Sequence, residues 1–209
     1  MPHPAPAVQP EAGRVIFVRQ QFSQFGGAEL ILDRMLAALA ARGERVALLG
    51  RSWRADRQTV EFIPCDPPKI ARPFRETLFA RAACRLIAHD KNALVQAHER
   101  IPCCDIFRAG DGVHAAYLEA RRRTQSALGR LAAGFSLFHR NTLALERELF
   151  ASPRLRAVIV NSTMVADDIV RHFDFPRERI HLVPNGIDLA RFNPKVREQQ
   201  RAAIRAKLG

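Results

Sequence analysis

The apolar residues of the chain gather in short runs that alternate with longer stretches of mixed polarity. Short runs rich in valine, isoleucine and leucine, bounded by polar residues, are typical of strands buried in a sheet. They predict strands at residues 15–18, 46–49, 60–63, 94–97, 105–108, 157–160 and 179–183. The segment from Ala28 repeats its apolar residues at i, i+3, i+4 and i+7, which predicts an amphipathic helix capped by Gly43. Further helices are predicted at about 74–89, 113–123, 127–150, 164–173 and 195–208.

The regular alternation of strand and helix predicts the architecture. A strand, a helix and a second strand within about 35 residues form a βαβ unit, whose crossover is right-handed and whose strands are parallel. Repetition of this unit predicts an α/β, Rossmann-like parallel sheet with helices on both faces. Residues 1–13 carry four prolines and predict a flexible leader, because proline provides no backbone donor.

Composition indicates a folded protein with a basic surface. Apolar residues make up 47% of the 209 residues, and the net charge is +12, almost all from arginine. Such a charge favours nucleic acid, anionic lipid or phosphorylated partners, although a GC-rich genome would also favour arginine over lysine. Nucleic acid is the weakest of these, because no recognised binding motif is present and the chain has one Trp and one Tyr.

The cysteines and the absence of long apolar runs predict a location. Cys65, Cys84, Cys103 and Cys104 have neither paired C-x-x-C spacing nor a neighbouring histidine pattern, so no zinc site is expected. No run approaches the roughly 20 apolar residues of a membrane span, and the N-terminus does not resemble a secretory signal. We therefore expect a cytoplasmic protein whose cysteines are free thiols.

The glycines of the FGGAE segment, Gly26 and Gly27, lie between the first strand and the first helix. They either form a tight turn or allow a ligand close to the backbone, where a helix N-terminus would attract an anion. The pattern is not G-x-G-x-x-G, and no Gly-Lys-Ser/Thr follows. A nicotinamide, flavin or P-loop nucleotide site is therefore disfavoured.

A second candidate site follows the strand at 105–108, where Asp111 and His114 are three residues apart. A carboxylate and an imidazole at a strand end can bind or deprotonate a sugar hydroxyl. The simpler alternative is that Asp111 caps the next helix while His114 packs beside it. His98, after the preceding strand, has the same two interpretations. The run at 121–123 is three arginines on a helix, either a solvated face or a contact with phosphate or lipid headgroups.

Residues 157–194 resemble a known family. A strand ending in Asn161-Ser162 and a second ending in Pro184-Asn185-Gly186-Ile187-Asp188 are followed by Arg191-Phe192 and Pro194. This block is similar to the end of the N-terminal domain in family 4 glycosyltransferases of the GT-B fold. The FGGAE segment and DIFRAGDGVHAAY most resemble the lipopolysaccharide core sugar transferases within that family.

The resemblance implies transfer of a sugar, with retention of configuration, from a UDP- or GDP-linked donor to a glycolipid or glycan acceptor. It implies no metal and no further cofactor. Gly26 and Gly27 would lie over the donor diphosphate, and Asp111 would lie on the acceptor side. Either His98 or His114 would approach the transferred sugar. The remaining donor-side positions of the motif are Asn161, Ser162, Asn185 and Gly186.

The resemblance also implies an organisation in which residues 14–194 form the acceptor-side N-terminal domain. Residues 195–209 would be a helical lead-in to a C-terminal donor-binding domain. Because GT-B catalysis needs two domains to close around a cleft, we expect this chain to be inactive without such a domain or a split partner. The basic charge suits a peripheral protein at the inner face of the membrane. The alternative function is a non-catalytic module that binds glycan or anionic lipid.

Overall fold

The computed structural model describes residues 13–21, 27–53, 60–124, 136–186, 189 and 193–208. Seven strands form one sheet: β1 (Val15–Val18), β2 (Val46–Gly50), β3 (Val60–Pro64), β4 (Leu94–Ala97), β5 (Ile106–Ala109), β6 (Ala157–Val160) and β7 (Ile180–Leu182). The α-helices described are α1 (Gly27–Ala41), α2 (Arg75–Ile87), α3 (His114–Thr124), α5 (Leu137–Phe150), α6 (Thr163–Phe173) and α7 (Pro194–Leu208). Short 3₁₀ turns occupy Arg72–Phe74 and Arg177–Arg179.

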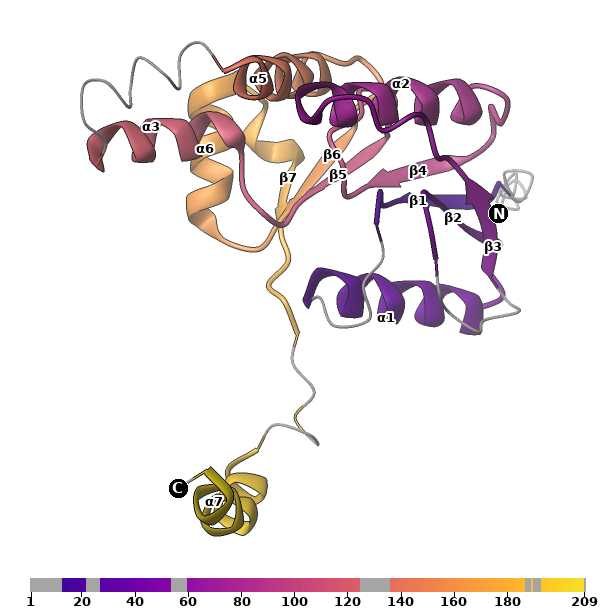
Figure 1. The fold of residues 1–209 in the computed structure, drawn as a ribbon. Helices are drawn as coiled ribbons and strands as arrows, with labels where there is room; N and C mark the ends of the chain where they lie inside the picture. Colours follow the sequence, from indigo (N-terminus) through magenta and orange to yellow (C-terminus); the bar gives the residue numbers. More distant parts are fainter. Residues whose placement is uncertain are drawn as a thin grey trace, which may run out of the picture.

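The sheet is parallel throughout and has the order β3-β2-β1-β4-β5-β6-β7 (Figure 1). From β1 the chain builds outward to β3, then crosses to β4 and builds outward in the opposite direction to β7. The direction of winding therefore changes between β1 and β4. Ligands of open α/β sheets bind beyond the carboxyl ends of the strands at such a point. This confirms the predicted Rossmann-like fold.

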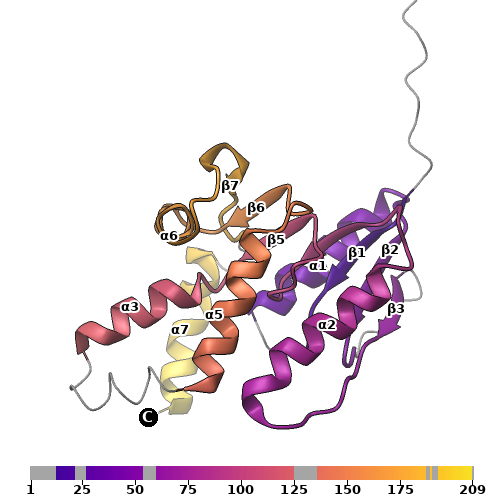
Figure 2. The same cartoon turned by 90° about the horizontal axis from the view of Figure 1, so that it is seen from above.

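Helices cover both faces of the sheet, as predicted. On one face, α1 packs Leu32 and Leu36 against Phe17 of β1 and Leu48 of β2. On the other face, α2, α5 and α6 bury a larger apolar core against β4, β5 and β6 (Figure 2). Right-handed crossovers explain this division, because a change of winding direction moves the crossover helices to the opposite face.

Two helix ends confirm predictions made from single residues. Gly43 has a φ of 80°, in the left-handed region that follows many helices and that glycine adopts without strain. At the start of α6, the Ser162 hydroxyl accepts a hydrogen bond from the backbone N–H of Val165, at 3.4 Å. These local interactions define where α1 ends and where α6 begins.

Three predicted boundaries differ from the structure for identifiable reasons. The helix predicted from Phe74 begins at Arg75, because a 3₁₀ turn with Pro73 in it precedes the helix. The helix predicted over 127–150 is described from Leu137, where Ser136 forms an extended N-cap; residues 125–135 lie outside the described part. Asp105 precedes β5 instead of starting it, because its carboxylate accepts the backbone N–H of Val95 at 2.9 Å.

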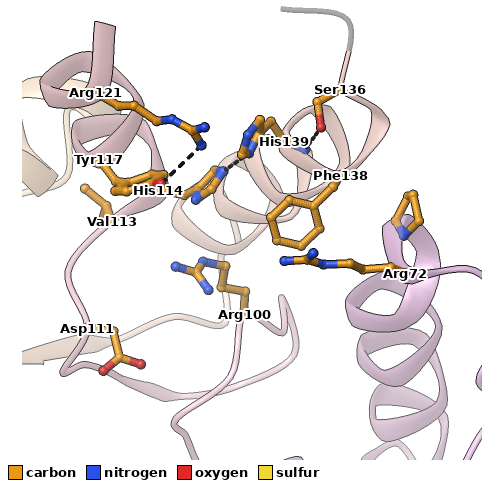
Figure 3. A pocket seen from close by; sticks show the side chains of 11 residues that line it. Arg72, Arg100, Asp111, Val113, His114, Tyr117, Arg121, Ser136, Phe138 and His139 are labelled. Carbon is orange, nitrogen blue, oxygen red and sulfur yellow. Dashed lines mark hydrogen bonds between the residues drawn. The ribbon is translucent and has the colours of Figure 1, made fainter. Parts of the chain in front are cut away.

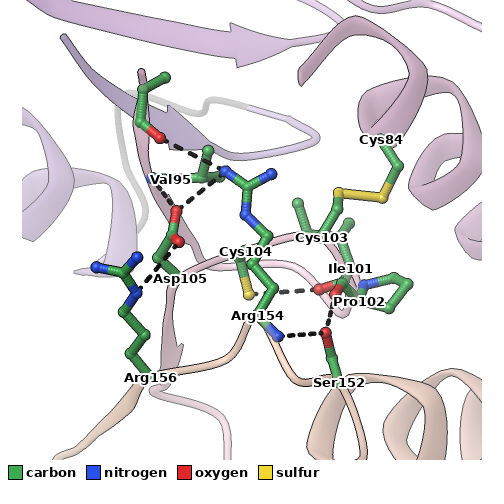
Figure 4. Close-up of polar contacts among 11 residues, drawn as sticks. Cys84, Val95, Ile101, Pro102, Cys103, Cys104, Asp105, Ser152, Arg154 and Arg156 are labelled. Atoms are coloured by element: carbon green, nitrogen blue, oxygen red, sulfur yellow. Dashed lines mark hydrogen bonds and ion pairs between the residues drawn. A yellow bond between two sulfur atoms is a disulfide. The ribbon is translucent and has the colours of Figure 1, made fainter. Parts of the chain in front are cut away.

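The expectation of four free thiols is wrong. Cys84 on α2 and Cys103 in the β4–β5 connection form a disulfide, with their Cα atoms 5.6 Å apart (Figure 4). Cys65 and Cys104 are free and buried. The two partners are 19 residues apart, and they meet because α2 packs over the sheet beside the β4–β5 connection. No spacing rule applies to a pair brought together by tertiary packing.

None of the side chains of helix α7 is buried, and all of them except that of Val196 are exposed. The helix lies apart from the sheet in Figure 1. The helix predicted at 195–208 is thus confirmed, whereas its role as a lead-in to another domain stays a prediction. Among the described residues, no helix is both long and apolar enough to cross a membrane.

Candidate functional site

Asp111 lies at the carboxyl edge of the sheet. It follows β5 in a turn whose Gly112 has a φ of 74°, and its side chain is exposed. Three pockets meet at this residue, because Asp111 lines each of them. We call them the histidine pocket, the amide pocket and the basic pocket. No other described residue lines all three, so ligands bound in the three pockets would meet at Asp111.

The histidine pocket has a volume of about 660 Å³ and is formed mainly by α3 and the start of α5 (Figure 3). The His114 Nε2 and His139 Nδ1 atoms are 2.9 Å apart, so one ring donates a hydrogen bond to the other. His114 also stacks on Tyr117, with ring centroids 5.5 Å apart. The pocket is lined by Arg72, Pro73, Arg100, Asp111, Val113, His114, Tyr117, Arg121, Ser136, Phe138 and His139.

Both imidazoles of this pocket are neutral near pH 7. Burial, followed by the charges of Arg100 and His139, lowers the pKa of His114 to about 4. Burial also lowers the pKa of His139, with smaller contributions from Arg121 and Arg72. A neutral pair provides both a donor and an acceptor of hydrogen bonds, which suits sugar hydroxyls.

Glu146 of α5 organises the wall between Asp111 and the histidines. Its buried carboxylate accepts hydrogen bonds from the backbone N–H groups of His114 and Ala115, at the start of α3. It also accepts one from Nε of Arg100, at 3.0 Å. The start of α3 is thus capped from another helix, and Asp111 remains available to solvent. Asp111 does not cap α3, which was the simpler of its two interpretations.

His98 lies on the opposite face of the sheet from His114. It continues the face of β4 that carries Gln96, whose Nε2 atom is 3.3 Å from Nε2 of His98. Its ring faces Phe17, with centroids 6.3 Å apart. Burial, then the positive charges of Arg108 and Arg19, lowers the pKa of His98 to about 3. The structure therefore does not bring His98 and His114 together, and which one approaches a sugar stays a prediction.

The predicted asparagines and Ser162 connect the strand ends. Asn161 donates from Nδ2 to the carbonyl of Gly110 at 2.9 Å, which joins the ends of β6 and β5. Asn185 accepts a hydrogen bond at 2.7 Å from Nη2 of Arg108. These two side chains and Ser162 line the amide pocket, whose volume is about 670 Å³. Gly186 is exposed and does not line it.

Gly27 is the first residue of α1, and Gly26 lies outside the described residues. A Cβ atom added at Gly27 would meet no described heavy atom within 4 Å, and its φ is not in the left-handed region. Gly50 of β2 is a contrast, because a Cβ there would be 2.3 Å from the Arg19 carbonyl oxygen. Packing thus explains Gly50, whereas no described contact requires a glycine at position 27.

Within the described ranges, no three His, Cys, Asp or Glu side chains converge as metal ligands would. The expected independence from metal stays a prediction.

Comparison with known proteins identifies the family. The model of Glycosyltransferase Family 4 matches residues 25–191, which is well over half of the chain. This chain belongs to Glycosyltransferase Family 4. The matched range includes the FGGAE segment, all the candidate site residues and the Asn185-Gly186 turn.

Two curated proteins match most of this chain, each at less than 30% identity. The lipopolysaccharide glucosyltransferase WaaG of Escherichia coli is 24% identical over 175 residues, which cover 83% of this chain and 45% of WaaG. A protein described as a "probable transglycosylase" from Burkholderia thailandensis is 29% identical over 177 residues, covering 81% of this chain and 44% of that protein. The chain spans about half the length of the curated relatives it matches.

Two solved glycosyltransferase structures confirm the fold. The crystal structure of WaaG, a glycosyltransferase involved in lipopolysaccharide biosynthesis, matches with a TM-score of 0.74 at 22% identity. The match covers 90% of this chain and 50% of WaaG, so the fold is the N-terminal half of a GT-B fold. A glycosyltransferase from Rickettsia africae matches with a TM-score of 0.55 at 12% identity, covering 93% and 50% of the two chains.

Several residues of this family member's pockets had no signal in the sequence. Glu146 and His139 lie on α5, more than 20 residues from Asp111, and resemble ordinary helix residues. Arg51 and Arg100 are two among many arginines. Only the position of Arg51, two residues after the strand predicted at 46–49, could have suggested it, because strand ends form the ligand edge of the sheet.

Proposed function

We propose that this chain is the acceptor-side half of a retaining glycosyltransferase. The sugar would pass from a UDP- or GDP-linked donor to a glycolipid or glycan acceptor in lipopolysaccharide or envelope glycan synthesis. The observation that carries the proposal is the exposed Asp111 carboxylate, where three pockets meet at the carboxyl edge of the sheet. Membership of Glycosyltransferase Family 4 supports the reaction class.

The acceptor would enter through the histidine pocket. In this proposal, the Asp111 carboxylate accepts a hydrogen bond from the acceptor hydroxyl that attacks the donor sugar. The neutral His114–His139 pair, 2.9 Å apart, would hold neighbouring hydroxyls. The exposed ring of Tyr117 and that of Phe138 offer apolar surfaces to a sugar face. Pockets that bind sugars commonly combine such apolar surfaces with a few fixed polar groups.

The donor would bind on the opposite side, over the start of α1. The N–H groups of the first turn of a helix have no partners within the helix, and its dipole favours a negative charge. No described heavy atom lies within 4 Å of a Cβ built at Gly27, which would leave room for a diphosphate close to these groups. Asn185 and Arg108 lie at the same edge, and the Arg108 charge would favour an anionic donor.

The test joins this chain to the C-terminal half of WaaG and measures transfer from UDP-glucose and other UDP- or GDP-sugars. Transfer to a lipopolysaccharide core acceptor, lost without the added half, is the expected result. A folded fusion that transfers no sugar from any of these donors would contradict the proposed function. The unfused chain is the control, because the donor-binding domain is expected to be required.

A second candidate function, binding of anionic lipid, has a specific feature in its favour. Arg121, Arg122 and Arg123 are exposed on α3, next to the exposed Tyr117. A cluster of this kind can attract an anionic membrane surface, with a strong dependence on salt. The location proposed is the cytoplasm, with attachment to the inner membrane face. Co-sedimentation with phosphatidylglycerol vesicles at low and high salt tests it, and equal binding to phosphatidylcholine vesicles would contradict it.

A further inference from the structure

The basic pocket lies beyond β1 and β2, beside the start of α2, and has a volume of about 390 Å³. Five cationic side chains and three carboxylates line it, so cations outnumber anions. Two of the three carboxylates have partners of their own, whereas Asp111 is exposed. Glu99 accepts the backbone N–H of Gln20 at 2.8 Å and lies 3.6 Å from Arg19, and Glu76 accepts the hydroxyl of Thr142 at 3.1 Å.

Arg51 contributes a buried charge to the wall of this pocket. Its side chain is only 3% exposed, lies over the ring of Phe79, and donates from Nη1 to Asp66 and to the carbonyl of Pro67. Its Nε and Nη2 atoms form no hydrogen bond with any described residue. Buried donors without partners cost free energy, so an arginine held in this state is better explained by a ligand than by stability.

Two exposed cations complete the pocket without any partner in the described chain. Lys69 and Arg75 line it, and neither forms an ion pair or hydrogen bond with another described residue. Arg75 is the first residue of α2, where the helix dipole disfavours a positive side chain. The N-cap residue Phe74 provides no side-chain acceptor for the first N–H groups of α2. The two cations and the start of α2 therefore both favour an anion in the basic pocket.

The basic pocket adjoins the proposed acceptor site. Arg100 and Asp111 line both the basic pocket and the histidine pocket. A sugar in the histidine pocket could therefore carry a substituent into the basic pocket while its hydroxyl contacts Asp111.

We propose that the basic pocket binds an anionic substituent, a phosphate or a carboxylate, of the acceptor sugar. This inference rests on the proposed function, because it names the class of acceptor. Arg51 provides a fixed charge, and Lys69 and Arg75 close on the anion from the exposed side. The acceptor is then an acidic sugar and not a neutral one.

Isothermal titration of the 209-residue chain at low salt tests the proposal, with glucose 6-phosphate, glucuronate, glucose and inorganic phosphate as probes. At least one anionic sugar should bind more tightly than both glucose and inorganic phosphate. The double variant Lys69→Gln/Arg75→Gln should bind this sugar about tenfold more weakly, since two charged contacts are lost. Both side chains are exposed, so the variant should remain folded.

The control variant Arg85→Gln/Lys91→Gln removes the same charge from the opposite end of α2 and the turn after it. It should bind as the unmodified chain does. Equal weakening in both variants would mean a general charge effect and would overturn the proposal. Inorganic phosphate binding as tightly as the anionic sugars, or no binding of either anionic sugar, would overturn it as well.

The fusion assay separates this proposal from the proposed function. A fusion that transfers sugar equally well to neutral and acidic acceptors would overturn the anionic subsite and leave the transferase function intact. Binding of anionic sugar that depends on Lys69 and Arg75, without transfer in any fusion, would support the subsite and contradict the transferase function.

Discussion

The two sides of the carboxyl edge differ in how their polar groups are satisfied. On the side of α1, the polar side chains pair with one another: Arg108 with Asn185 at 2.7 Å, and Gln96 with His98 at 3.3 Å. On the side of α2, α3 and α5, the side chains surround open pockets, and Lys69 has no partner among described residues. The first side is preorganised by its own contacts, whereas the second leaves charge and space for a ligand.

This difference assigns different roles to similar residues. His98 and His114 both have a lowered pKa, but His98 sits among residues of the sheet face and His114 lines a pocket. Arg108 and Arg51 are both buried, but Arg108 donates to a side chain at the same edge and Arg51 retains two unpaired groups. Burial alone therefore does not identify a ligand site; unsatisfied polar groups beside an open volume do.

The largest expected effect comes from removing the residue that holds the open side together. Glu146→Ala leaves the N–H groups of His114 and Ala115 and the guanidinium of Arg100 without their acceptor. Loss of one partner of a buried charge network costs about 3 kcal/mol of the free energy of unfolding. Urea denaturation measures this cost, and Glu148→Ala, an exposed change on the same helix, should cost less than about 0.5 kcal/mol. Equal costs would contradict the network.

Asp111→Asn distinguishes a reacting group from a structural one. In the active fusion, the substitution should lower the turnover of sugar transfer about 100-fold, equivalent to about 2.7 kcal/mol of activation free energy. The midpoint of thermal unfolding should not change, because the side chain is exposed and does not cap α3. A loss of stability with unchanged turnover would place Asp111 among the structural residues.

The disulfide connects α2, which carries Arg75, to the segment that follows Arg100. Cys84→Ala should lower the free energy of unfolding by about 2 kcal/mol, because the bond restricts the unfolded chain over a short loop. Dithiothreitol should lower the stability of the unmodified chain by a similar amount and leave the variant unchanged. If dithiothreitol has no effect on the unmodified chain, the bond does not form in solution.

The histidines on both sides should make the folded protein less stable in acid. A folded-state pKa of about 3 for His98 and about 4 for His114 lies below the unfolded value of about 6.5. The unfolded chain therefore binds more protons below pH 6.5, and each group lowers stability by about 1 kcal/mol per pH unit on acidification. The contribution is fully present above pH 6.5 and is lost progressively down to the folded pKa.

Urea denaturation between pH 7.5 and pH 4.5 measures these slopes. His114→Asn and His98→Asn should each reduce the slope, and the double variant should reduce it most. Parallel curves for the unmodified chain and both single variants would mean that neither imidazole is held neutral by the fold.

The fold and part of the candidate site could be predicted from local sequence patterns. The strand at 157–160, with Asn161 and Ser162 after it, was predictable because apolar periodicity and capping residues act within one element. Asp111 was predictable because strand ends mark the ligand edge of a parallel sheet. The division between His98 and His114 was not, because the face that a residue takes after a strand depends on the connection that follows.

The sequence by itself determined the order of strands and helices, the parallel sheet, the family and the position of Asp111 at the carboxyl edge. These depend on periodicity and on turn residues, which are properties of neighbouring positions. Only the tertiary structure decided that Cys84 meets Cys103, that Glu146 caps α3 and that Arg51 faces a pocket with unpaired donors. Each of these contacts joins separate elements, so its geometry arises from how the helices pack on the sheet.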